Sequence, residues 1–283
     1  MRADHKSMKP PLQPVLRVSG LSKSYQRKGA GLWRNSDVIA AASDVTFDIF
    51  PGQTLALVGS SGSGKSTVAR CVTRVERPDA GQVWLQGTDI AQLDSRELSS
   101  LRAKMQMIFQ DAATSMNARF TAAEVIEEPL LIRRQGDKCS RRTRAKELMQ
   151  EVGLSPEWGD RRALDFSGGQ RQRLAIARAL TLKPALLVLD EALSGLDLSI
   201  EAQVANLLID LQTAHSLAYL FISHDLALVA RLADTIAVMA HGRIVEQGPA
   251  AQVIANASHS ETRALIAATK AAQMNLAAVG AAL

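Results

Sequence analysis

The sequence has only two cysteines and no long uninterrupted apolar run. Cys71 and Cys139 lie far apart and form no CxxC pair, so neither a disulfide framework nor a zinc site is indicated. No uncharged apolar run approaches the roughly 18 residues that a membrane-spanning helix needs. Residues 1–14 are polar and contain prolines, whereas a secretory signal has a basic segment followed by an apolar core. We therefore expect a chain that works in a reducing cytosol and does not itself cross a bilayer.

The composition is that of an ordinary globular protein. Of 283 residues, 47% are hydrophobic and 22% are charged, enough for one large domain or two small ones. Lysine and arginine (33) exceed aspartate and glutamate (28), and this excess is compatible with nucleic acid, anionic lipid or neither as a partner. We favour a solvated helical face over a docking patch for the basic cluster of Arg133, Arg134, Lys138, Arg141, Arg142, Arg144 and Lys146.

Three apolar segments predict the centre of the fold. They are Thr54–Val58, Ala185–Asp190 and Leu217–Ser223. Segments that are apolar on both faces and are separated by helices predict a parallel sheet covered on both sides. Between about Phe120 and Phe166 the pattern is helical with little strand character, and the tail from Ser258 is also predicted to be helical.

The glycine-rich stretch GSSGSGKST follows the first of these strands and precedes a helical pattern. This context and the spacing Gly-x4-Gly-Lys-Ser fit a phosphate-binding loop, in which backbone amides and a helix N-terminus face the phosphate oxygens. The lysine supplies charge to the β- and γ-phosphates, and the serine hydroxyl is a ligand for Mg²⁺. The predicted phosphate-binding residues are Gly59, Ser60, Ser61, Gly62, Ser63, Gly64, Lys65, Ser66 and Thr67.

A pair of acids ends the second apolar strand. Asp190 and Glu191 follow an apolar run, and open α/β sheets bind ligands at the carboxyl ends of their strands. One carboxylate can hold the metal through water while its neighbour polarises the attacking water. We predict Asp190 for the metal and Glu191 as the catalytic base.

The stretch FSGGQRQRLAIARAL at Phe166–Leu180 resembles the signature of ATP-binding cassette (ABC) transporter ATPases, and the resemblance covers nearly the whole chain. It implies an α/β P-loop ABC ATPase fold with a mostly parallel core sheet, an antiparallel β subdomain and a helical insert. It also implies a head-to-tail dimer, in which each signature faces the γ-phosphate held by the other subunit. The signature residues are Ser167, Gly168, Gly169 and Gln170.

Further residues take their predicted roles from this resemblance. Tyr25 resembles the aromatic residue that stacks on adenine, and Gln110 resembles the glutamine that reaches Mg²⁺ and the attacking water. Asp197 ends the segment SGLD, which resembles the loop by which the two subunits sense each other. His224 resembles the switch histidine that contacts the γ-phosphate. The implied ligands are ATP and Mg²⁺, the metal being held by Ser66, Gln110 and Asp190.

The resemblance also predicts the domain organisation. We expect a single ABC ATPase domain over residues 15–283, preceded by a flexible N-terminus at 1–14. Residues 15–110 and 167–257 form the RecA-like core with its β subdomain. Residues 111–166 form the helical subdomain, and 258–283 form a C-terminal helical tail.

Several stretches resemble the peptide and nickel importer branch of the family. They include FQDAATSMNARFT, VIEEPLLI and the closing segment from GRIVEQGPAAQVI onwards. Departures are Ala118 and Ala192, where that branch usually has proline, and the absence of a cysteine-rich tail. We expect a peptide importer first and a nickel chelate importer as the alternative.

The implied partners are a second ATPase subunit, identical or paralogous, two membrane permeases and an extracytoplasmic binding protein. The implied location is the cytoplasmic face of the inner membrane. A DNA-repair ABC ATPase is less favoured, because the insert is short and lacks sustained heptads, and no nucleic-acid partner is expected. A GTPase or kinase is disfavoured because neither class uses SGGQ, and a regulatory subunit with little turnover remains open for a heterodimer.

Overall fold

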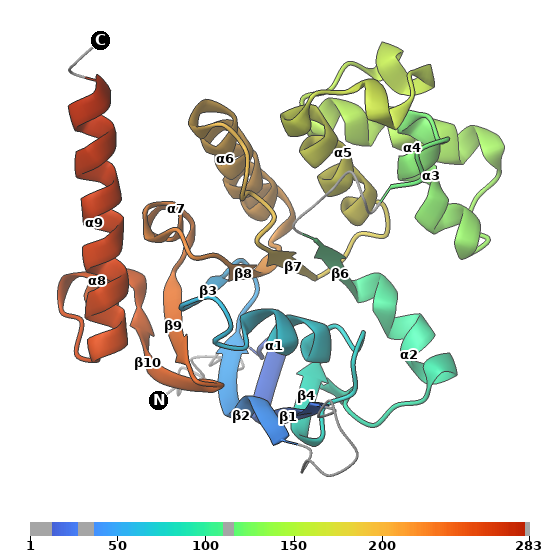
Figure 1. Ribbon diagram of the computed structural model, residues 1–283. Helices are drawn as coiled ribbons and strands as arrows, with labels where there is room; N and C mark the ends of the chain where they lie inside the picture. Colours follow the sequence, from blue (N-terminus) through green and yellow to red (C-terminus); the bar gives the residue numbers. More distant parts are fainter. Residues whose placement is uncertain (1–12, 28–36, 110–115, 281–283) are drawn as a thin grey trace, which may run out of the picture.

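The computed structural model describes residues 13–27, 37–109 and 116–280, and within them two β-sheets carry the helices (Figure 1). The larger sheet has its strands in the order β10-β9-β3-β8-β7-β6. The strands are β3 (Thr54–Val58), β6 (Met105–Ile108), β7 (Leu186–Asp190), β8 (Ala218–Ile222), β9 (Thr235–Ala240) and β10 (Arg243–Pro249). β6, β7, β8, β3 and β9 run parallel, whereas β10 runs antiparallel to β9. The core sheet is thus mostly parallel, as the sequence predicts.

The three central strands are short and completely buried. β3, β7 and β8 each have five residues, and every one of these residues is buried. Alternate residues of a strand point to opposite faces, so each strand contributes to two separate cores. A continuous apolar run is what such a strand requires.

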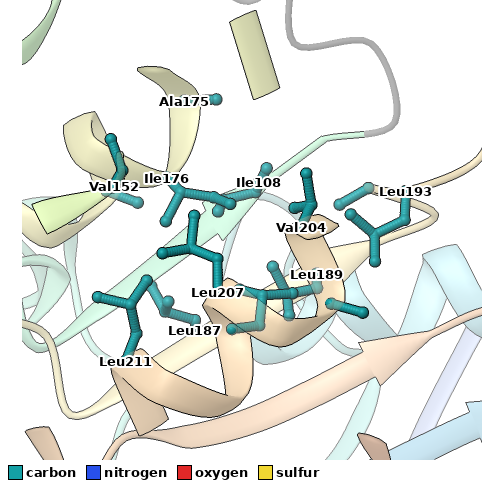
Figure 2. Packing of buried hydrophobic residues seen from close by; sticks show 14 of the residues in the cluster. Ile108, Val152, Ala175, Ile176, Leu187, Leu189, Leu193, Val204, Leu207 and Leu211 are labelled. Atoms are coloured by element: carbon teal, nitrogen blue, oxygen red, sulfur yellow. The ribbon is translucent and has the colours of Figure 1, made fainter. Parts of the chain in front are cut away.

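One core lies between the sheet and the helices above it. Leu187 and Leu189 of β7 point into this core, where they pack near Leu207 and Leu211 of α6 (Leu198–His215), as Figure 2 shows. The opposite face of β7 presents Leu186 and Val188 to a second core. Both faces of the sheet are therefore covered, as the sequence predicts.

The second core is closed by one helix and by the smaller sheet. That sheet has the strand order β2-β1-β4-β5, and all of its pairs are antiparallel. The helix α1 (Lys65–Val72) contributes Val68, Ala69 and Val72 to this core. The strands of the smaller sheet are β1 (Leu16–Arg27), β2 (Asp37–Ile49), β4 (Ala80–Leu85) and β5 (Thr88–Asp89).

Helices fill the connection between β6 and β7. Helices α3, α4 and α5 pack on one another and lie together on one side of Figure 1. Thr121 and Asp137 cap α3 and α4 by accepting hydrogen bonds from Glu124 N and Ser140 N. The elements are α3 (Ala122–Ile132), α4 (Lys138–Glu151), the 3₁₀ helices η2 (Pro156–Asp160) and η3 (Ala163–Asp165), and α5 (Gly168–Leu180).

The remaining helices flank the sheets. They are α2 (Ser95–Leu101), η1 (Arg102–Lys104), α7 (Leu226–Leu232), α8 (Ala250–Ala255) and α9 (Ser260–Gly280). The helical tail predicted from Ser258 corresponds to α9, which ends the described chain at the edge of the molecule (Figure 1). Within the described ranges, no helix combines the length and the apolar character needed to span a membrane.

The basic cluster of residues 133–146 is partly neutralised by neighbouring acids. Arg142 pairs with Glu127 at 3.3 Å and also with Asp160. Arg144 pairs with Glu147 at 3.3 Å, one turn along α4. These contacts favour the solvated-face interpretation for Arg142 and Arg144, the members of the cluster that they neutralise.

Leu187→Ala tests the packing of the central sheet. Leu187 has no exposed surface, so its truncation should lower the free energy of unfolding by about 2–5 kcal/mol. The matched control is Leu131→Ala, because Leu131 is 58% exposed and its truncation should change stability by less than about 0.5 kcal/mol. Urea denaturation of both variants measures the difference, and equal effects would contradict the described core.

Candidate active site

The glycine-rich loop connects β3 to α1 and is enclosed by neighbouring backbone. Gly64 has φ of +107°, in the left-handed region, and a Cβ there would lie 1.9 Å from the carbonyl oxygen of Ala41. A Cβ at Gly59 would lie 2.1 Å from the carbonyl oxygen of Met239. Only glycine fits at these two positions. A tight glycine turn at the N-terminus of a helix suits the binding of phosphate oxygens.

Lys65 is the first residue of α1, and its ammonium group lies across this loop. It donates hydrogen bonds to the carbonyl oxygens of Gly59 and Ser60, each at 2.9 Å. The residue is 5% exposed, and burial lowers the pKa of its amine, although the charges of Glu191 and Asp190 oppose this shift. The buried ammonium of Lys65 therefore points into the glycine-rich loop.

A direct hydrogen bond joins the loop to the acidic strand end. Ser66 Oγ donates to Asp190 Oδ1 at 3.0 Å. Asp190 is buried, and burial raises the pKa of its carboxyl group, while the hydrogen bond from Ser66 acts in the opposite direction. A hydroxyl and a carboxylate oxygen side by side are the hard ligands that Mg²⁺ prefers. The two residues fit a magnesium ion that is shared with a phosphate.

Glu191 follows Asp190 at the turn after β7. Its backbone has φ of +48°, a left-handed conformation that costs a non-glycine residue on the order of 1–3 kcal/mol. Ser194 holds this turn, because its amide and its hydroxyl donate to the Glu191 carbonyl at 3.0 and 2.7 Å. The Glu191 carboxylate lies 3.7 Å from His224 Nδ1, and both residues line a cavity of about 130 Å³. The two predicted catalytic residues are therefore neighbours.

The SGGQ turn begins α5. Ser167 caps this helix: Gln170 N donates to Ser167 Oγ at 3.4 Å, and Ser167 N donates to Gln170 Oε1 at 2.9 Å. α5 packs with α3, α4, α6 and β6, whereas α1 packs with β1, β2, β7 and β8, so the two helices share none of these neighbours. The turn and the phosphate loop of one chain thus belong to different parts of the molecule (Figure 1).

The two signature glycines differ in their surroundings. A Cβ at Gly168 would lie 3.8 Å from Leu196 Cδ2, which is an ordinary contact. A Cβ at Gly169 would lie 2.3 Å from Ile200 Cγ2, so Gly169 is needed for α5 to pack against α6. The packing of α6 on this turn was not predicted from the sequence.

The remaining predicted residues lie on separate elements. Asp197 stands at the N-cap of α6, but its side chain makes no capping hydrogen bond. Tyr25 lies on β1, is 37% exposed, and donates a hydrogen bond from its hydroxyl to Glu76. The sequence analysis did not single out Glu76, because no motif marks it. Gln110 lies outside the described residues.

The structure therefore brings one group of predicted residues together and leaves another apart. One group lies at one edge of the core sheet. Ser66 is hydrogen-bonded to Asp190, the charge of Lys65 interacts with those of Asp190 and Glu191, and Glu191 lies near His224. The signature turn and Asp197 lie beside each other through the contacts of α5 with α6. The individual roles assigned to these residues stay predictions.

Comparison with known proteins identifies relatives of the whole fold. The family model described as "ABC transporter" matches residues 42–194. A probable peptide ABC transporter ATP-binding protein, y4tS of Sinorhizobium fredii, is 47% identical over 90% of this chain and 72% of the relative. The dipeptide transport ATP-binding protein DppF of Escherichia coli is 44% identical over 91% of this chain and 77% of its own length.

A solved structure extends the likeness to three dimensions. The ATP-binding cassette MJ0796, described as a dimer in a post-hydrolysis state bound to ADP and Pi, superimposes with a TM-score of 0.72. The match covers 83% of this chain and 98% of that chain, at 26% sequence identity. The expected cassette fold is thereby confirmed.

Gly169→Ala tests the packing of the signature turn. The added methyl group meets Ile200, so the free energy of unfolding should fall by about 1–3 kcal/mol. Gly168→Ala is the matched control and should leave stability unchanged within about 0.5 kcal/mol. Ile200→Ala should restore part of the loss when combined with Gly169→Ala. Denaturant titration measures all three variants, and equal stability of the two glycine variants would rule out this packing role.

Proposed function

The chain belongs to the ABC transporter family, and on that premise we propose that it is the ATP-hydrolysing subunit of an importer that drives peptide uptake. The observation that carries this proposal is the 3.0 Å hydrogen bond between Ser66 and Asp190, which joins the phosphate loop to the acidic strand end. Relatives whose names specify peptide or dipeptide transport align over 90% and 91% of the chain, which favours peptide over nickel as the cargo.

The protein binds ATP at the carboxyl edge of its core sheet. The phosphates lie in the loop formed by Gly59–Thr67, and the Lys65 ammonium exchanges its carbonyl partners for oxygens of the β- and γ-phosphates. The ring of Tyr25, which is partly exposed, stacks on the adenine base.

Ser66 and Asp190 would hold a Mg²⁺ ion together with the nucleotide, and Gln110 is the third residue predicted for the metal. Mg²⁺ is usually bound by one or two protein side chains together with substrate phosphates, and a hydroxyl with one carboxylate fits that pattern. The bound ion supplies positive charge that stabilises the negative charge of the phosphates.

Hydrolysis uses the residues beside this pair. Glu191 accepts a proton from the attacking water, and His224 donates a hydrogen bond to the γ-phosphate. The 3.7 Å separation of their side chains supports a shared action on one water and one phosphate. Positioning and charge stabilisation account for most of the catalysis.

Two such subunits close head to tail around ATP. The signature turn of one subunit, made of Ser167, Gly168, Gly169 and Gln170, faces the γ-phosphate held by the other subunit. Asp197 lies at the same interface. The separation of α5 from α1 within one chain supports this arrangement, because the two glycine turns then meet only between chains (Figure 1). A dimeric relative of the same fold supports it as well.

The helical region transmits closure to the membrane permeases. A groove of about 880 Å³ lies between β6 and the helices α3 and α5. Ile132, which is 72% exposed, and Phe109, which is 44% exposed, offer apolar surface to a docking helix. We place two permeases on this side, with the chain at the cytoplasmic face of the inner membrane and an extracytoplasmic binding protein delivering the peptide.

Glu191→Gln tests the catalytic assignment in the assembled transporter. A peptide-loaded binding protein should accelerate ATP hydrolysis by the wild type, while the variant should lose at least about 100-fold in turnover, because it lacks the general base. The variant should still bind ATP and dimerise, as measured by equilibrium nucleotide binding and by light scattering. Vigorous hydrolysis by Glu191→Gln would exclude this role, and stimulation by a nickel chelate but not by peptide would overturn the choice of cargo.

Ile132→Glu tests the permease groove. A carboxylate in the apolar groove should lower peptide uptake and co-purification with the permeases at least about tenfold, because docking would have to strip water from an unpaired charge. Leu131→Glu is the matched control, because Leu131 is 58% exposed on the same helix but does not line the groove. ATP hydrolysis by the detached subunit should be equal in both variants. Equal transport by both would remove the groove from the docking surface.

A further inference from the structure

The ring of Tyr25 is held by a partner that belongs to no motif. Tyr25 pairs across the smaller sheet with Ile39, and both side chains are partly exposed, at 37% and 49%. An exposed tyrosine at a strand end is free to rotate unless its hydroxyl is bound. Here the hydroxyl donates a hydrogen bond to Glu76 Oε2.

Glu76 is itself fixed to the helix of the phosphate loop. It lies in the segment after α1, and its amide donates to the carbonyl oxygen of Arg70 at 3.1 Å. Its second carboxylate oxygen, Oε1, lies 3.5 Å from the guanidinium of Arg70. Glu76 therefore uses one oxygen for α1 and the other for Tyr25, and it connects the helix to the ring.

The segment after α1 also binds β1, the strand that carries Tyr25. Asp79 accepts hydrogen bonds from Lys23 Nζ at 2.8 Å and from the amide and hydroxyl of Ser24 at 2.7 and 2.9 Å. The Lys23 ammonium lies over the ring of Tyr25, 5.8 Å from its centroid. The strand backbone, the ring and the hydroxyl are thus each held in place.

We propose that Glu76 is a positioning residue for nucleotide binding: through the Tyr25 hydroxyl it holds the ring in the orientation that stacks on the base. The inference rests on the proposed function, because it needs a nucleotide whose phosphates occupy the loop at α1. A side chain that is ordered before binding loses less conformational freedom when the ligand arrives. Glu76 contributes to the affinity for the base without touching the nucleotide.

The experiment compares two ligands that differ by the nucleoside. ADP and inorganic pyrophosphate, both with Mg²⁺, are titrated calorimetrically into the full chain. Neither ligand is a substrate of the proposed ATPase reaction, so the heat measured is that of binding. The variants are Glu76→Ala, Glu76→Gln, Tyr25→Phe and the double variant Tyr25→Phe/Glu76→Ala. Glu147→Ala is the control, since it removes a glutamate that pairs with an arginine elsewhere on the surface.

Glu76→Ala and Tyr25→Phe should each weaken ADP binding about three- to tenfold, the cost of ordering one side chain that is no longer held in place before the ligand arrives. Pyrophosphate binding and the thermal midpoint should stay at wild-type values. The double variant should lose less than about twofold beyond Tyr25→Phe, because that substitution already removes the contact with Glu76 together with the interaction of the hydroxyl with Thr67. Glu76→Gln should retain most of the ADP affinity, because its amide oxygen still accepts the hydroxyl although the ion pair with Arg70 is lost.

Four results would overturn the inference. The first three are unchanged ADP affinity in Glu76→Ala, an equal loss for pyrophosphate, and additive losses in the double variant. An affinity loss in Glu76→Gln as large as in Glu76→Ala would assign the effect to the Arg70 ion pair and also reject it. A wild-type chain that binds neither ADP nor ATP would instead refute the proposed function, so the two failures are distinguishable.

Discussion

The hydrogen bond from Ser66 to Asp190 joins two segments that are 124 residues apart in the chain. It can form because β3 and β7 are both parallel neighbours of β8, so the loops after them emerge at one edge of the sheet. The apolar runs of these strands are therefore functional as well as structural. Leu187 and Leu189 in Figure 2 anchor the strand that ends at Asp190 in the core.

Charge at this edge is balanced over a short distance. Lys65 is buried with its amine pKa lowered by burial, and Asp190 is buried with its carboxyl pKa raised by burial. The charge of each group opposes the pKa shift that burial causes in the other. The ammonium also donates hydrogen bonds to the carbonyl oxygens of Gly59 and Ser60. A phosphate that enters the loop would offer the ammonium charged acceptors in place of neutral carbonyl oxygens, and hydrogen bonds to charged acceptors are stronger.

Much of this arrangement could be predicted from the sequence, because the informative signals are local. The buried strands, the glycine loop with Lys65 and the acid pair each occupy a few consecutive residues. What could not be predicted depends on distant contacts. Gly169 packs on Ile200, and the Tyr25 hydroxyl contacts Glu76. The left-handed Glu191 donates its amide to the carbonyl oxygen of Ile222 on β8.

The helix α1 has one further consequence. It has eight residues, so its ends lie about 12 Å apart, and a helix cannot stretch without breaking its hydrogen bonds. Its first residue serves the phosphate end of a ligand, and Arg70 near its last turn anchors the glutamate that holds the aromatic ring. One short rigid helix thus joins the loop proposed for the phosphates to the side chain that holds the ring proposed for the base, so a displacement of either end of α1 is passed to the other.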